Sequence, residues 1–78
     1  MINDNELAKY LRRALNTYYR DLDGEQPRKI YEMVMYSVEK PLIETILQKA
    51  EGNQTQAAEI LGINRNTLRK KIKLHKIN

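Results

Sequence analysis

The sequence predicts an all-α fold of four helices, in which two long helices form a homodimer core and two short ones form a C-terminal helix-turn-helix. Apolar residues recur at three- and four-residue steps through the first fifty residues, a period typical of amphipathic helices. Residues 52–78 instead contain two short capped segments joined by a turn. The charge divides at the same point, because residues 1–51 hold eight Lys/Arg and nine Asp/Glu, whereas residues 52–78 hold six and one. We therefore expect a helical dimerisation region at 1–51 and a basic helix-turn-helix region at 52–78, within one compact domain overall.

The first helix is expected from Asn5 to about Asp21. One apolar stripe runs along it, formed by Leu7, Leu11, Ala14, Leu15, Tyr18 and Leu22. Basic side chains lie off this stripe, at Lys9, Arg12, Arg13 and Arg20. The turn-forming residues of segment 21–26 then end the helix.

A second, longer helix is expected to begin at Pro27, because proline suits the first position of a helix. Its apolar period continues almost to Gly52 and keeps the same phase on both sides of Pro41. The predicted stripe consists of Ile30, Met33, Val34, Ser37, Val38, Leu42, Ile46, Leu47 and Ala50. A proline inside a helix either ends it or kinks it, and no loop residue marks an end here. We therefore predict one kinked helix of about 24 residues, roughly 36 Å long.

Such a long apolar helix favours a dimer. A chain this short buries little of its own surface, and the helix-turn-helix cannot cover the whole stripe. Two chains that pack their first two helices antiparallel would form a four-helix core with one helix-turn-helix at either end. A compact monomeric bundle is the alternative.

The stretch GNQTQAAEILGINRNTLRKKI, residues 52–72, predicts the helix-turn-helix. Asn53 and Gln56 have the spacing of a capping box, so a helix should start at Gln54. Gly62 is suited to end it in the left-handed conformation, and Asn64 can cap the next helix. The short turn and the small Ala57–Ala58 pair allow the two helices to cross closely.

The second of these helices presents a basic outer face. Projection at about 100° per residue places Leu68 and Ile72 inward. The outward side chains are those of Asn66, Arg69, Lys70 and Lys73. At the start of the helix, free backbone N–H groups and the positive end of the helix dipole favour phosphate oxygens. The combined pattern predicts double-stranded DNA as the partner.

The sequence lacks the residues that a disulfide or metal site, a membrane span or an enzyme active site would need. There is no cysteine for a disulfide or thiolate site, and no apolar stretch near 18 residues for a membrane span. The single His75 is expected at the surface, and Glu39 and Glu44 are too far apart for an acid/base pair. The five tyrosines are not interleaved with basic residues as a base-stacking platform requires. We therefore expect no enzyme activity, no cofactor, no metal and no membrane partner.

The chain resembles the Fis family of bacterial nucleoid-associated, DNA-bending proteins. The resemblance extends over nearly the whole chain, through LRRALNTYY, KPLIETIL and above all GNQTQAAEILGINRNTLRKKIK. It implies an intertwined, all-helical homodimer in the cytoplasm and nucleoid that regulates transcription. In this family the recognition helices lie closer together than successive major grooves, so the DNA must bend, and binding favours AT-rich centres through DNA shape. The same helix-turn-helix also ends activators of the nitrogen-regulator type, whereas a Met directly before the first helix indicates the free-standing form.

The resemblance also implies the DNA-contacting residues. They are Asn53, Thr55, Asn64, Arg65, Thr67, Arg69, Lys70, Lys71 and Lys73. Arg65 is expected to read a base, a guanine in the major groove, and the others are expected to hold phosphates.

Three departures from the family pattern limit the resemblance. The family member that stimulates DNA inversion has a β-hairpin arm before its first helix, and this sequence has no residues for one. Glu51 replaces a basic residue that contacts RNA polymerase, a further expected partner, although Gln48, Gly52 and Gln54 match. Leu74 replaces a lysine that reaches phosphate. Two other functions are alternatives: a helical protein-interaction module with a basic tail, and an RNA-binding adaptor.

Overall fold

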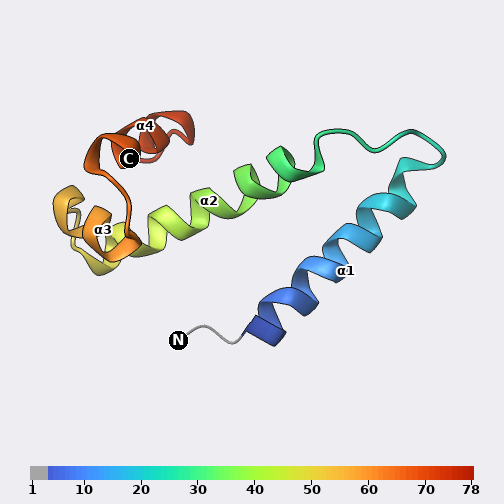
Figure 1. Ribbon diagram of the computed structural model, residues 1–78, viewed down its shortest axis with the longest axis horizontal. Helices are drawn as coiled ribbons and strands as arrows, with labels where there is room; N and C mark the ends of the chain where they lie inside the picture. The colour runs from blue at the N-terminus through green and yellow to red at the C-terminus, as the bar shows by residue number, and fades with distance from the viewer. Residues whose placement is uncertain (1–3) are drawn as a thin grey trace. The chain divides into compact units, whose positions relative to one another are not determined.

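The computed structural model describes residues 4–78, and these form four helices without a strand. In chain order the helices are α1 (Asp4–Leu22), α2 (Ile30–Lys49), α3 (Gln54–Leu61) and α4 (Arg65–Leu74) (Figure 1). The predicted all-α class and the predicted order of four helices are confirmed. The first three residues, which the predicted dimerisation region 1–51 includes, lie outside the described residues.

The described chain divides after Ile30 into two compact units. The first unit contains α1, a single amphipathic helix. Its apolar side chains remain exposed or partly exposed, and Leu7 and Tyr10 are among the most accessible. An isolated helix of this length is marginal in water, because helix nucleation is costly and most helical stability comes from packing. Among residues 5–30 no side chain is buried, so the described part of the first unit forms no hydrophobic core of its own.

The start of α2 differs from the prediction. Pro27 does not occupy the first helical position, because the helix begins three residues later at Ile30. Lys29 adopts a left-handed backbone conformation, with φ of 51°, which cannot belong to a right-handed helix. Gln26 is also a poor N-cap residue, so nothing favours an earlier start. The helix consequently has 20 residues, which corresponds to about 30 Å rather than 36 Å.

The helix α2 runs without interruption through Pro41, as predicted. Proline has no N–H, so the carbonyl of Ser37 lacks its usual donor four residues later. One turn earlier the Ser37 hydroxyl donates to the Met33 carbonyl at 2.9 Å, a bond that tends to bend a helix. The predicted kink at Pro41 stays a prediction.

Two apolar stripes run along neighbouring faces of α2, about 100° apart around the helix axis. The predicted single stripe missed Ile43, which is one of the two largest fully buried side chains of the chain. Ile43 and Ala50 are buried against the helix-turn-helix, with Ile46 and Leu47 partly buried beside them. The second stripe, formed by Tyr31, Met35, Val38 and Leu42, remains exposed. The prediction merged the two stripes because they lie on neighbouring faces and together form one broad apolar region.

The helix-turn-helix forms as predicted. Asn53 caps α3, since its side-chain oxygen accepts from the Gln56 N–H at 3.0 Å. In a full capping box the Gln56 side chain would also accept from the Asn53 N–H. Here the Asn53 N–H donates to the Ala50 carbonyl instead. Gly62 ends α3 with φ of 78°, and the Ile63 N–H returns to the Ala58 carbonyl at 3.0 Å. This pair of features is the Schellman arrangement that glycine allows without strain.

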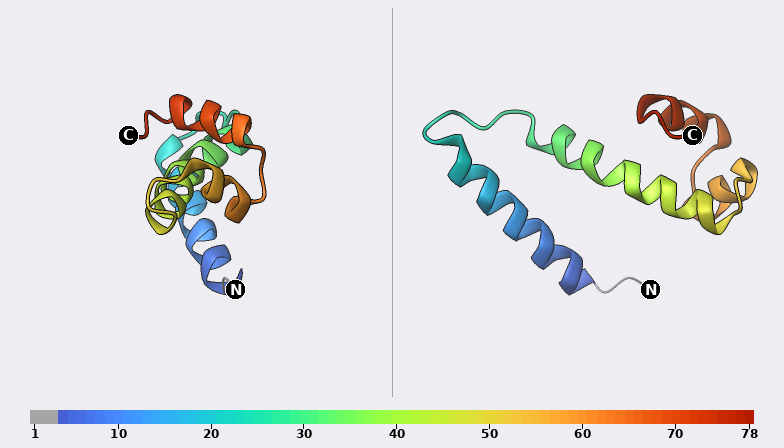
Figure 2. Two further views of the ribbon diagram at one scale, coloured as in Figure 1. Left: turned by 90° about the vertical axis from the view of Figure 1, so that its left-hand side faces the viewer. Right: turned by 180° about the vertical axis from the view of Figure 1, so that it is seen from behind.

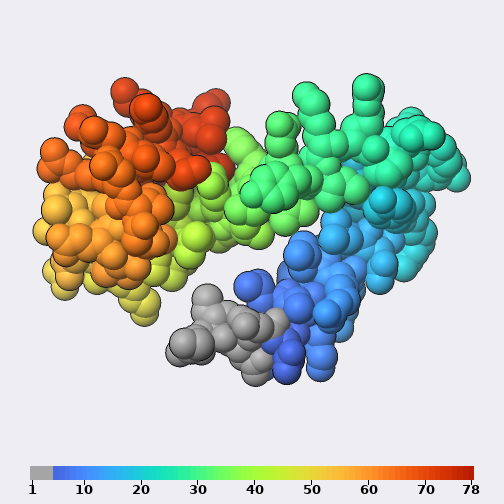
Figure 3. Space-filling view, viewed as in Figure 1, coloured from blue at the N-terminus to red at the C-terminus, as the bar shows by residue number. Residues whose placement is uncertain are grey.

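The core of the second unit lies where α3 and α4 cross the C-terminal half of α2. It consists of Ile43, Ala50, Ala57, Ala58 and Leu68. The two alanines have side chains small enough for α4 to approach α3 closely, and Leu68 fills the space between them. Figures 2 and 3 show α3 and α4 gathered at this end of α2. No helix among residues 4–78 has the length and apolar character needed to cross a bilayer.

Candidate nucleic-acid interface

The start of α4 lies next to the first turn of α3. The guanidinium of Arg65 donates to the hydroxyl of Thr55 at 3.4 Å, which joins residues ten positions apart in the sequence. Around this contact the surface is hollowed, and the hollow is lined by Gln54, Thr55, Arg65, Arg69, Ile72 and Lys73. Four of these six residues were predicted to contact DNA, so the fold gathers separate parts of the predicted set on one surface.

Neither short helix carries an acidic residue in its first turn. The positive ends of both helix dipoles therefore have no carboxylate in the first turn of their own helix to neutralise them. Asn64 caps α4 through its side-chain oxygen, which accepts from the Asn66 N–H at 2.7 Å. Because Asn53 and Asn64 both use the oxygen for capping, their amide N–H groups are the donors available to a ligand. The arrangement suits an anion.

The basic outer face of α4 is exposed. Eight of the nine residues that were predicted to contact DNA are exposed to solvent. They are Asn53, Thr55, Asn64, Arg65, Thr67, Arg69, Lys70 and Lys73. Asn66, which was predicted to point outward, is exposed as well. Leu68 is fully buried and Ile72 partly buried, as the helical projection predicted.

Lys71 lies apart from the rest of the predicted set. Its ammonium group donates to the carboxylate of Glu39 on α2 at 2.6 Å, and its side chain is 31% exposed. This contact holds Lys71 against the body of the second unit. A phosphate contact by Lys71 would have to compete with a carboxylate that is already in place.

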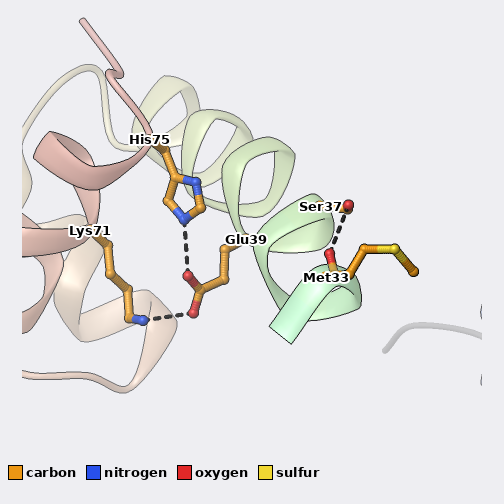
Figure 4. Close-up of polar contacts among 5 residues, drawn as sticks. All are labelled: Met33, Ser37, Glu39, Lys71 and His75. Atoms are coloured by element: carbon orange, nitrogen blue, oxygen red, sulfur yellow. Dashed lines mark hydrogen bonds and ion pairs between the residues drawn. The ribbon is translucent and has the colours of Figure 1, made fainter. Parts of the chain in front are cut away.

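His75 is buried, so the prediction that it lies at the surface is wrong. Only 2% of the residue is exposed, and its Nε2–H donates to the second carboxylate oxygen of Glu39 at 2.9 Å (Figure 4). The ring of Tyr36 covers it, with 4.7 Å between the ring centroids. The cause is the end of α4, because His75 is the C-cap residue and α4 lies against α2 there. A pattern of neighbouring lysines could not reveal this long-range packing.

Glu39 therefore connects α2 to α4 through two partners. The hydrogen bond from Lys71 holds the pKa of the Glu39 carboxyl below its usual value of 4.5, and the bond from His75 lowers it further, against a smaller opposing effect of burial. The sequence offered one signal for this cluster, which is that positions 71 and 75 are one helical turn apart on the same side of α4. The carboxylate that meets them is more than 30 residues away.

Comparison with known proteins decides the family. Residues 35–74 match the model of the family described as bacterial regulatory protein, Fis family. The chain belongs to the Fis family. The matched segment covers the C-terminal part of α2 and the whole helix-turn-helix, the same part of the chain that forms the hydrophobic core.

Individual Fis-family relatives extend the match beyond that segment. A protein of Ralstonia nicotianae described as a Fis-like DNA-binding protein is 54% identical over 71 residues, which cover 91% of this chain and 92% of the relative. The DNA-binding protein Fis of Glaesserella parasuis serovar 5 is 46% identical over 70 residues, which cover 90% of this chain and 71% of the relative. The family resemblance recognised in the sequence is therefore confirmed.

Proposed function

We propose that this Fis-family chain is a homodimeric protein that binds and bends double-stranded DNA, and that it regulates transcription and helps to organise the nucleoid. The observation that carries the proposal is the surface at the start of α4. Arg65 and Thr55 meet there beside two helix N-termini that no first-turn carboxylate neutralises. Phosphate oxygens are the ligands that such a surface prefers. Two relatives that cover most of the chain are described as DNA-binding proteins, which supports the same partner.

The division of work among the site residues follows from their positions. Arg65, at the first position of α4, has a planar guanidinium that can bond both acceptors of a guanine in the major groove. Lys70 and Lys73 on the exposed side of α4 carry point charges suited to phosphates. Thr55, Thr67 and the two capping asparagines supply further neutral donors. We assign Lys71 a smaller share because Glu39 already holds its ammonium group.

The exposed stripe of α2 supports the proposed homodimer. Tyr31, Met35, Val38 and Leu42 recur at helical spacing on one side and remain open to solvent. The apolar stripe of α1 also includes accessible leucines, Leu7 and Leu11. Contiguous apolar surface of this kind indicates a protein interface, and a second copy presents the same self-complementary surface. In such a dimer, closely spaced α4 helices would require the duplex to bend, which supplies the proposed preference for deformable centres.

A fluorescence-anisotropy titration tests the proposal with two duplexes that share flanking guanines and differ in an AT-rich or GC-rich centre. We expect tighter binding to the AT-rich duplex. Lys70→Ala should weaken both complexes by a similar factor, whereas Arg65→Ala should cost about 1–3 kcal/mol at sites with the guanines and relax specificity there. Arg28→Ala, in the loop before α2, is the control and should change neither complex.

Three results would contradict parts of the proposal. If Arg65→Ala lowers DNA affinity by the same factor at sites with and without the guanines, another residue must read the base. Unchanged DNA affinity of Arg65→Ala would favour a protein-interaction module in which the helix-turn-helix is a fold element only. A preference for single strands would favour an RNA-binding adaptor. The oligomeric state, measured by sedimentation, should be a dimer, and a monomer at all concentrations would refute the arrangement.

A further inference from the structure

A second basic surface lies on α1, away from the helix-turn-helix sequence. It consists of the side chains of Lys9, Arg12, Arg13, Asn16, Thr17 and Arg20, which we call the α1 basic face. These positions form two neighbouring rows with a spacing of four residues, 9–13–17 and 12–16–20, so they lie on one side of the helix, and together they line a shallow depression. All six side chains are exposed.

The charge of the α1 basic face is not balanced within the helix. Glu6 and Asp21 are the acidic residues nearest to its two ends, and none stands between them. Among the described residues no ion pair involves Lys9, Arg12, Arg13 or Arg20. Like charges one turn apart, as at Lys9 and Arg13, destabilise a helix by a few tenths of a kcal/mol. A face kept only for solubility would mix both signs, whereas a polyanion would relieve this repulsion.

The apolar stripe of α1 fixes where the basic face points. Leu7, Leu11 and Tyr18 lie on the side of the helix opposite to Lys9 and Arg13. A partner that contacts only the apolar side would therefore leave the α1 basic face exposed, so the two faces can make different contacts.

We propose that the α1 basic face binds the phosphate backbone of double-stranded DNA in addition to the surface at α4. The proposal rests on the proposed function, since DNA held at α4 is the polyanion present. The four cations extend over about 17 Å of helix, a length over which a duplex carries about ten phosphate charges. Asn16 and Thr17 lie among the cations and add neutral donors of the type found in phosphate contacts. No base-reading geometry is involved, so the contact is independent of sequence.

The phosphates can come from two sources, and the experiment separates them. One source is the flank of the duplex bound at α4, and the other is a second duplex. A short duplex limited to the helix-turn-helix footprint is compared with one extended by about 10 bp, one helical turn, on either side. A second assay measures energy transfer between two duplexes with different labels, which rises only when one protein particle holds both.

The variant Arg12→Gln/Arg13→Gln removes two charges and keeps helix propensity, because arginine and glutamine are similar helix formers. Arg28→Gln/Lys29→Gln is the matched control, since it removes two charges from the loop outside the α1 basic face. If the first variant loses two phosphate contacts per copy, the negative slope of log affinity against log salt should become shallower by about 1.8 per copy. The ratio of wild-type to variant affinity should then drop by about 12-fold between 50 and 200 mM salt for each copy that contacts DNA, and by about 150-fold when both copies of the proposed dimer do so.

The outcomes decide the proposal. If Arg12→Gln/Arg13→Gln lowers affinity only for the extended duplex, the α1 basic face binds the flank of the duplex held at α4. If the variant lowers the energy transfer, the face binds a second duplex. The proposal is overturned if Arg12→Gln/Arg13→Gln matches both the wild type and the control in every DNA assay while keeping its helical circular dichroism. It is also overturned if the variant affects only binding to anionic phospholipid vesicles. Wild-type protein that binds no duplex, or binds without sensitivity to Arg65→Ala, would instead contradict the proposed function.

Discussion

The contact between α2 and α4 predicts a specific response to the substitution Glu39→Gln. Glutamine has nearly the same shape as glutamate, so the packing around α2 is kept. It removes the negative charge and leaves a single side-chain oxygen where the carboxylate accepts from both Lys71 and His75. Either His75 changes tautomer and accepts from the new amide N–H, or one of the two donors loses its partner, and in both cases the bonds to a charged carboxylate are lost.

The expected loss of stability lies between two limits. An exposed ion pair contributes about 0–1 kcal/mol, and breaking a fully buried pair costs about 3–5 kcal/mol. Glu39 is between these cases, with 20% of its side chain exposed, against 31% for Lys71 and none for His75. Because the amide keeps one oxygen as an acceptor, we expect Glu39→Gln to lower the free energy of unfolding by about 1–2 kcal/mol. For a domain of this size, each kcal/mol corresponds to about 4–8 °C in Tm.

Urea unfolding followed by circular dichroism at several pH values provides the assay. The folded-state pKa of Glu39 is lowered, so its contribution is complete above the usual value of 4.5 and is lost as pH falls through the lowered folded pKa. The wild type should therefore exceed Glu39→Gln in stability at neutral pH, and the difference should shrink in acid. Other carboxyl groups titrate equally in both proteins and cancel in this difference.

Glu44→Gln is the control, because Glu44 is exposed on the same helix. A double-mutant cycle with Lys71→Met should give a coupling energy above about 0.5 kcal/mol between positions 39 and 71. If Glu39→Gln and Glu44→Gln show the same stability and the same pH dependence, the cluster contributes nothing and the reasoning is refuted.

Two further predictions concern packing and backbone strain. Leu68→Ala should lower the free energy of unfolding by about 2–5 kcal/mol, since the side chain is fully buried between the short helices, whereas exposed Leu74→Ala should change it little. Glu51→Gly should raise the free energy of unfolding by about 0.5–1 kcal/mol in the same urea assay, because Glu51 adopts φ of 54° at the end of α2. Glu51→Ala keeps the strained conformation, so a gain equal to that of glycine would contradict this account.

The helix-turn-helix could be predicted almost to the residue because its signals are local. Asn53, Gly62 and Asn64 act on the backbone within a few residues, so capping and left-handed termination can be read directly from the sequence. The start of α2 could not be predicted in this way. Pro27 permits a helix to begin but does not require it, and the conformation of Lys29 has no clear sequence signal.

The candidate site was predictable only where it follows helical periodicity. The exposed face of α4 follows from a projection of the helix, and burial of Leu68 follows from the same projection. The link between Glu39 and His75 depends on how α4 packs on α2, which periodicity does not specify. Family resemblance transferred Lys71 into the DNA-contacting set by its position, and the ion pair that separates it from the other residues became visible only in the structure.

The helix α2 is the element on which the proposed DNA geometry depends. One face of it holds the helix-turn-helix through Ile43, Ala50 and the two bonds of Glu39, and a neighbouring face presents the exposed stripe that we propose for contact with a second copy. In the proposed dimer, α2 therefore connects each α4 to the partner copy. The thickness and direction of α2 then determine where α4 lies. The distance between the two α4 helices, and with it the bend imposed on the duplex, is then set by α2 and not by the residues that touch DNA. The predicted kink at Pro41 would therefore affect the bend of the duplex in the proposed dimer, although Pro41 lies far in sequence from the basic face of α4.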